Sequence, residues 1–81
     1  MHESVGAQQI VRTVLAEAGR RRAKAVTSIL VEVGELDGLR EDVLREAFAL
    51  EAEGTPAEGA VLTVRRTEGR GLVIRKASFV T

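Results

Sequence analysis

Several residue types that often carry protein chemistry are missing or scarce in this 81-residue chain. There is no Cys, which excludes a disulfide, a thiolate nucleophile and a cysteine-ligated zinc site within these residues. Trp and Tyr are absent and Phe occurs twice, so single-stranded nucleic acid has almost nothing to stack on. His occurs once, at position 2, which leaves little material for a nucleophile–base pair. We therefore expect no enzyme activity.

The charge balance and the short apolar runs exclude further classes. Twelve basic residues match twelve acidic ones, so the chain lacks the basic excess of a nucleic-acid or membrane-binding domain. Its apolar runs are a few residues long, too short to span a bilayer. The start, Met1–Ser4, has neither the basic nor the apolar region of a secretory signal. We expect a soluble cytoplasmic protein that binds neither nucleic acid nor membrane.

The residues that are present suffice for one small domain over residues 1–81. Hydrophobic residues make up 44% of the chain, which is enough for a core. Apolar spacing and turn residues predict a helix over 5–18 capped by Ser4, a strand over 25–34, a helix over 40–53, and strands over 60–66 and 72–80. The first helix either ends at Gly19 or continues for one more turn into Arg20–Arg22. This order, α-β-α-β-β, predicts an α+β fold with two helices packed on one face of a three-stranded mixed sheet.

The connections between the strands predict the topology of the sheet. A right-handed crossover through the second helix should make strands 25–34 and 60–66 parallel. The short connection Glu68–Gly71 contains two glycines and predicts a hairpin between the last two strands. The hairpin partner is then antiparallel, which makes the sheet mixed.

The last predicted strand changes the parity of its apolar side chains. Leu72 and Ile74 share one parity, whereas Ala77 and Phe79 have the other. Successive side chains of a strand point to opposite faces, so both pairs can face the core only with an extra residue between them. We therefore predict a bulge near Arg75-Lys76.

Two surface features have alternative interpretations. Leu30 should point to the sheet face that the helices leave uncovered, so this face is either solvated or covered by a second subunit, as in a homodimer. Its neighbours Ser28 and Glu32 are polar, which argues against a second core. The basic run Arg20–Lys24 is interpreted as a solvated helix end and not as a nucleic-acid patch, because the net charge is zero.

The single His directly follows Met1, where it can take part in metal binding. Bacterial-type processing removes an initiator Met only before a small residue, so Met1 should stay, with a free α-amine, ahead of His2. An α-amine and an imidazole both lose protons near neutral pH and then become metal ligands. With the amide nitrogens that follow, they can hold an ion in small chelate rings that favour Ni(II) or Cu(II) over Zn(II) or Mg(II). Alternatively, His2 is an ordinary disordered polar residue.

An ordered set of short segments runs through nearly the whole chain. It comprises Met1-His2-Glu3 before an amphipathic helix, Val26-Thr27, Val31–Leu36, Leu44–Phe48, Gly54–Ala60 followed by Leu62, and the closing Leu72, Ile74, Ala77 and Phe79. In this order the segments resemble the hydrogenase nickel-incorporation (HypA/HybF) metallochaperone family. Gly54–Ala60 is the most specific of them.

The resemblance implies a nickel carrier that catalyses no reaction. In that family nickel binds at the N-terminus, which implies Met1, His2 and Glu3 as ligands here, with Glu3 acting mainly through its backbone nitrogen. The resemblance also implies two kinds of partner, a nickel-handling GTPase and a nickel-enzyme precursor. The expected client is a [NiFe] hydrogenase.

One departure from the family pattern concerns zinc. The family normally carries two C-x-x-C pairs that hold a structural zinc, in a module inserted before the closing strand. Here Thr67–Gly71 occupies that place without any Cys, so we expect no structural zinc and a short turn in place of the module. The alternative function is therefore a zinc-less paralogue, an interaction module in metalloenzyme maturation that does not deliver metal.

Overall fold

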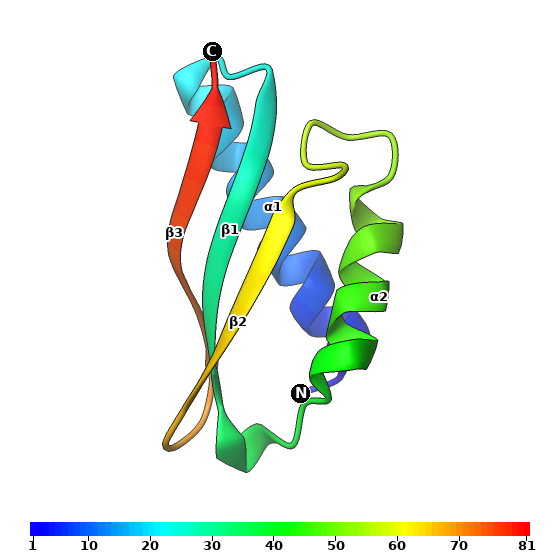
Figure 1. The fold of residues 1–81 in the computed structure, drawn as a ribbon, viewed down its shortest axis with the longest axis vertical. Helices are drawn as coiled ribbons and strands as arrows, with labels where there is room; N and C mark the ends of the chain where they lie inside the picture. The colour runs from blue at the N-terminus through cyan, green and yellow to red at the C-terminus, as the bar shows by residue number, and fades with distance from the viewer.

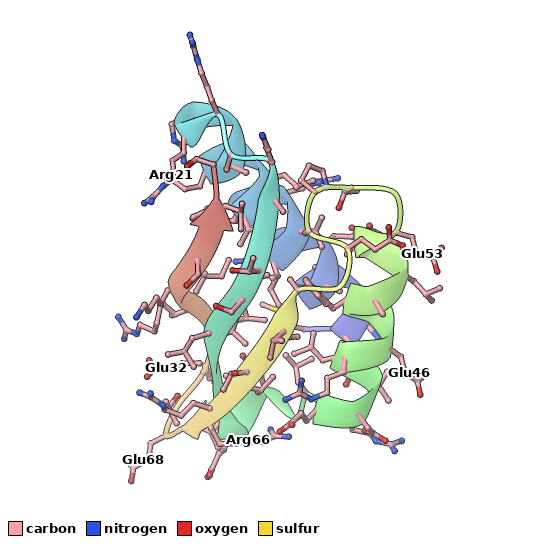
Figure 2. The ribbon with its side chains drawn as sticks, turned by 45° about the horizontal axis from the view of Figure 1, so that its top comes forward. Arg21, Glu32, Glu46, Glu53, Arg66 and Glu68 are labelled. Atoms are coloured by element: carbon pink, nitrogen blue, oxygen red, sulfur yellow. The ribbon has the colours of Figure 1, made fainter.

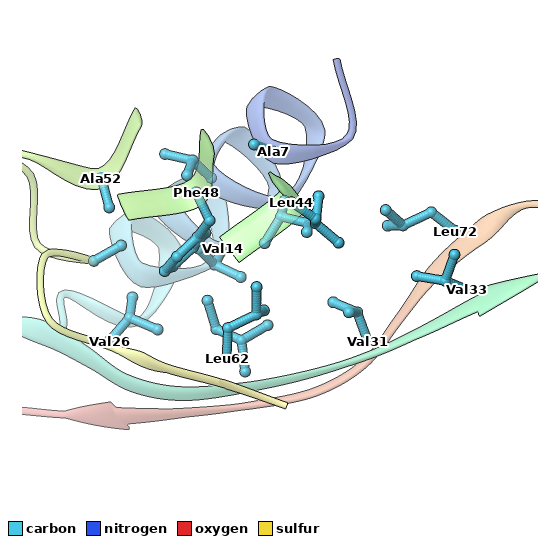
Figure 3. Packing of buried hydrophobic residues seen from close by; sticks show 14 of the residues in the cluster. Ala7, Val14, Val26, Val31, Val33, Leu44, Phe48, Ala52, Leu62 and Leu72 are labelled. Carbon is cyan, nitrogen blue, oxygen red and sulfur yellow. The ribbon is translucent and has the colours of Figure 1, made fainter. Parts of the chain in front are cut away.

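The computed structural model describes residues 1–81 and has two layers, a sheet and a pair of helices (Figure 1). The elements in chain order are α1 (Glu3–Arg21), β1 (Ala25–Gly34), the 3-10 turn η1 (Glu35–Asp37), α2 (Glu41–Ala52), β2 (Val61–Thr67) and β3 (Leu72–Val80). Both helices pack on the same face of the sheet, with the buried side chains between the layers (Figure 3). The predicted fold class and element order are confirmed. No helix combines the length and the apolar character needed to cross a membrane.

The sheet is mixed, as predicted, but its strand order differs from the expected hairpin. β1 lies in the centre, parallel to β2 on one side and antiparallel to β3 on the other. The predicted hairpin between β2 and β3 is therefore wrong, because these two strands do not pair. The crossover through α2 places β2 on one edge of β1. β3 takes the other edge, where it satisfies the remaining backbone groups of the most buried strand.

The connection from β2 to β3 crosses the end of β1 at Gly34. The Gly34 N–H donates to the Gly71 carbonyl at 2.8 Å, and the Leu36 N–H donates to the Gly69 carbonyl at 2.9 Å. A Cβ atom at position 34 would lie 2.6 Å from the Arg70 Cα, which is closer than real Cβ atoms come. Glycine at position 34 therefore allows this crossing.

The predicted bulge in β3 is present. Leu30 of β1 pairs with Lys76, and its neighbour Val31 pairs with Ile74, so Arg75 is the extra residue. Ile74 and Phe79 have opposite parity in the sequence, and because of the bulge both side chains pack against the core. A second register shift, between Val26 and Ser28 of β1, was not predicted, although it accompanies a change of parity from buried Val26 to buried Ile29 and Val31.

The start of the first helix differs from the prediction, and its end matches the longer of the two predicted alternatives. α1 begins at Glu3 with His2 as the N-cap, not at Val5 with Ser4 as the cap, and the Gly6 N–H donates to the His2 carbonyl at 3.0 Å. The helix continues past Gly19 to Arg21. Tertiary contacts extend it at both ends, because Glu3 contacts the start of α2 and Arg21 lies over the ring of Phe79.

The core fills the space between the helices and the inner face of the sheet. Ile10, Ile29 and Leu44 are its largest fully buried side chains, and no polar side chain is buried with them. Phe48 is also buried, from α2. Gly6 of α1 packs against Leu72 and Leu44, since a Cβ there would lie 3.3 Å from the first side chain and 3.5 Å from the second. The helices are thus fixed to each other close to the N-terminus.

Candidate metal centre

The residues predicted as nickel ligands lie at the N-terminal end of α1, beside the start of α2 (Figure 1). Met1 and His2 precede the helix and Glu3 is its first residue. Because the chain enters α1 without a linker, these three residues are held close to the helix–helix contact.

The side chain of Glu3 contacts the beginning of α2. Its Oε2 atom accepts a hydrogen bond of 2.8 Å from the backbone N–H of Arg40, the N-cap residue of α2. This bond, together with the N–H of Glu3 itself, lowers the pKa of the Glu3 carboxyl below its usual value. The carboxylate therefore links α1 to α2, which fits a role for Glu3 in metal binding through its backbone nitrogen.

His2 is exposed and its backbone lies outside the regular helix. It has an extended conformation (φ −80°, ψ 148°), and its carbonyl accepts the first helical hydrogen bond, from Gly6. The N–H groups of His2 and Glu3 precede that first bond and so have no carbonyl partner within the helix. The imidazole and two backbone nitrogens are thus close together and free of helical hydrogen bonds.

Met1 is half exposed, and its side chain turns back towards the helix. Its Sδ atom lies 3.5 Å from the position that a Cβ of Gly6 would take. The contact leaves the thioether against α1.

The structure contains no group of three or more His, Cys, Asp or Glu side chains that could hold a metal ion. His2 is the only imidazole in the chain and Cys is absent. A metal site at the N-terminus must therefore draw most of its ligands from the α-amine and the backbone nitrogens.

The basic run at the end of α1 is exposed, as expected. The guanidinium groups of Arg20 and Arg21 each lie 2.7 Å from a carboxylate oxygen of Glu17. No sequence pattern indicated the contact between Glu3 and Arg40, because the two residues are 37 positions apart and Arg40 belongs to no motif.

The fold is shared with a protein of known structure. The solution structure of the Ni metallochaperone HypA from Helicobacter pylori matches all of this chain and 95% of its own chain, with a TM-score of 0.71. The two sequences are only 13% identical, so this comparison establishes the fold alone. It places the chain in the class of α+β domains to which that protein belongs.

The sequence comparisons identify the family. Residues 1–72 match the family described as "Hydrogenase/urease nickel incorporation, metallochaperone, hypA". The chain is 44% identical over 64 residues to the hydrogenase maturation factor HypA of Archaeoglobus fulgidus, and 38% identical over 71 residues to that of Chlorobaculum tepidum. These alignments cover 79% and 88% of this chain. The chain belongs to the HypA family, which confirms the resemblance.

The chain spans only part of the length of these relatives. The alignments cover 58% of the Archaeoglobus protein, 63% of the Chlorobaculum protein and 49% of the HypA of Methanopyrus kandleri. The family match ends at Leu72, the first residue of β3.

Proposed function

We propose that this chain is a nickel carrier that binds Ni(II) through Met1, His2 and Glu3 and delivers it during maturation of a nickel enzyme, with a [NiFe] hydrogenase as the client. Membership of the HypA family is the observation that supports this role most strongly. The proposed role includes no catalysed reaction.

The ligand set follows from the local chemistry of the N-terminus. The α-amine of Met1, the backbone nitrogens of His2 and Glu3, and the imidazole of His2 can all reach one ion in small chelate rings. Such nitrogen sets suit Ni(II) in square-planar geometry. Nickel binding to the amide nitrogens of His2 and Glu3 would break no helical hydrogen bond, because the first such bond is donated by the Gly6 N–H. Nickel is the cargo here, and the exposed position of His2 leaves it open to transfer.

Two partners complete the proposal: a nickel-handling GTPase that receives or supplies the metal, and the precursor of the nickel enzyme. The relatives named above are hydrogenase maturation factors, which supports a client of this kind. An exposed site at one end of the domain is accessible to a second protein (Figure 1).

Nickel titration of the protein with its native N-terminus tests the site. We expect one Ni(II) per chain by calorimetry, with a visible absorption band of square-planar nickel. His2→Ala should abolish binding, and so should one glycine added before Met1, because it moves the amine away from the imidazole. A glycine added after Thr81 is the matched control and should leave binding unchanged. Equal affinity of the two extended proteins would contradict the site.

A second candidate function is that of an interaction module that delivers no metal. It is favoured by the connection between β2 and β3, which is four residues long and contains no Cys where the family pattern implies a zinc module. We propose that residues 1–81 form a single domain without structural zinc. The second candidate predicts a saturable complex with the maturation GTPase that is equally tight with and without nickel, whereas a carrier should show nickel-dependent transfer.

A further inference from the structure

A groove of about 360 Å³ lies between the C-terminal half of α1 and strand β3, far from the N-terminus. Its apolar lining comes from Val14 of α1 and from Ile74, Ala77 and Phe79 of β3. The remaining lining residues are polar or charged: Thr13, Glu17, Arg20, Arg21, Arg75 and Lys76. The groove thus combines an apolar floor with a charged rim.

The rim is strongly basic, with four cations and one carboxylate. Glu17 already binds both Arg20 and Arg21, each at 2.7 Å, and Glu32 of β1 binds Arg75 at 2.6 Å. The guanidinium of Arg21 also lies 4.7 Å from the centre of the Phe79 ring, and Figure 2 shows it beside the upper end of β3. Lys76 makes no ion pair. Four cations face two carboxylates once Glu32 is included, so the rim keeps a net positive charge, with Lys76 unpaired.

β3 is an edge strand, so one side of its backbone has no partner in the sheet. The other edge strand, β2, is partly engaged, since the guanidinium of Arg45 on α2 donates a hydrogen bond to the Leu62 carbonyl. The free edge of β3 and the groove lie next to each other, because residues 74–79 supply both.

Charge complementarity indicates what binds there. An added strand must be extended, which excludes the acidic helix α2 of a second copy. Pairing of β3 with β3 of a second copy would bring the Arg75 and Lys76 side chains of both copies together, and like charges across paired strands are unfavourable. An extended acidic segment from another protein satisfies both the free backbone groups and the basic rim.

We propose that the free edge of β3, together with the basic α1–β3 groove, binds an extended acidic segment of a partner protein as an additional strand. Small apolar side chains of the segment occupy the floor beside Ile74 and Phe79, and its carboxylates lie against the cations of the rim. This inference goes beyond the nickel site and does not depend on it.

A peptide titration monitored by ¹⁵N NMR tests the proposal without nickel. The probe is a synthetic peptide that alternates glutamate and valine, blocked at both ends. We expect saturable shifts of the amides of residues 74–79. The variant Lys76→Glu should bind roughly threefold more weakly, because the unpaired cation of the rim becomes repulsive while the Arg75–Glu32 ion pair stays intact. Arg70→Glu, an exposed charge reversal in the β2–β3 connection, is the control and should bind normally.

Further probes separate strand addition from other modes of binding. A peptide that alternates lysine and valine should not bind, and N-methylation of the acidic peptide on the backbone positions that face β3 should abolish binding. Equal binding of the lysine peptide, insensitivity to N-methylation in both registers, or shifts confined to α2 would each overturn the proposal. Self-association that shifts residues 74–79 at high protein concentration would also overturn it, in favour of a second copy.

Discussion

At the scale of single residues, two glycines of this chain have opposite roles. Gly34 lies under the β2–β3 connection, where a Cβ would meet backbone atoms of Arg70 at 2.6 Å. Gly19 lies in α1 with no atom within 4 Å of a Cβ built there. The same substitution should therefore change stability in opposite directions.

We expect Gly34→Ala to lower the free energy of unfolding by about 1–3 kcal/mol, because the backbone of the connection has to move. Gly19→Ala should raise it by roughly 0.5–1 kcal/mol, because alanine is the better helix former and restricts the unfolded chain. Urea denaturation at neutral pH measures both. A neutral Gly34→Ala variant would contradict the close crossing of β1.

Leu44 and Leu50 provide a second matched pair, on the two faces of α2. Leu44 is fully buried, whereas Leu50 is 69% exposed. Leu44→Ala should cost about 2–5 kcal/mol of unfolding free energy, from lost burial and the cavity left behind. Leu50→Ala should stay within about 0.5 kcal/mol of the parent protein. If denaturation showed similar losses for the two variants, the orientation of α2 would be wrong.

At the scale of elements, one carboxylate on the central strand β1 binds cations from both neighbouring strands on the outer face of the sheet. Glu32 of β1 lies 3.1 Å from Arg65 of β2 and 2.6 Å from Arg75 of β3. These side chains point away from the helices, on the side labelled by Glu32 in Figure 2. The hydrogen bond from Arg75, with the charge of Arg65, lowers the pKa of the Glu32 carboxyl below its usual value.

This lowered pKa predicts a dependence of stability on pH. The unfolded chain takes up the proton more readily than the folded chain, so the contribution of Glu32 is present above the ordinary pKa of about 4.5 and is lost as the pH falls below it. Glu32→Gln should therefore reduce stability at pH 7 and flatten its decline in acid. Glu46→Gln, on an exposed residue without an ion pair, is the control. A parallel acid decline in all three proteins would exclude this role.

At the scale of the whole molecule, the balanced net charge hides a segregation of charge along the chain. Residues 40–58, with α2, carry six acidic and two basic side chains, whereas residues 61–81, with β2 and β3, carry five basic and one acidic. Figure 2 shows Glu46 and Glu53 on the α2 side and Arg21 on the β3 side. The molecule therefore has an acidic side and a basic side, which can contact different partners.

The proposed nickel site also has a consequence for the whole molecule. Its ligands come from three consecutive residues, so the unfolded chain keeps them, and nickel should bind both states with similar affinity. A ligand stabilises a protein only through preferential binding to the folded state. Saturating Ni(II) should therefore shift the Tm by no more than about 2 °C in differential scanning calorimetry. A much larger shift would show that a residue from elsewhere in the fold completes the site.

The sequence by itself determined the type and order of the elements. Period-2 and helical apolar patterns come directly from residue spacing, and the change of parity between Ile74 and Ala77 located the β3 bulge. The same local information allowed a chelate at Met1, His2 and Glu3, because a terminal chelate needs only neighbouring atoms, and the family resemblance then favoured these residues as the predicted ligands.

Only the tertiary structure decided which strands pair and what the Glu3 carboxylate contacts. The connection Glu68–Gly71 is short and contains glycines, as hairpin turns do. β3 nevertheless pairs with β1, because the edge of β1 that β2 leaves open also needs hydrogen-bond partners. The start of α1 at Glu3 depends in the same way on the distant Arg40. Contacts between residues far apart in the chain leave no periodic pattern, and so they emerge only when the layers pack.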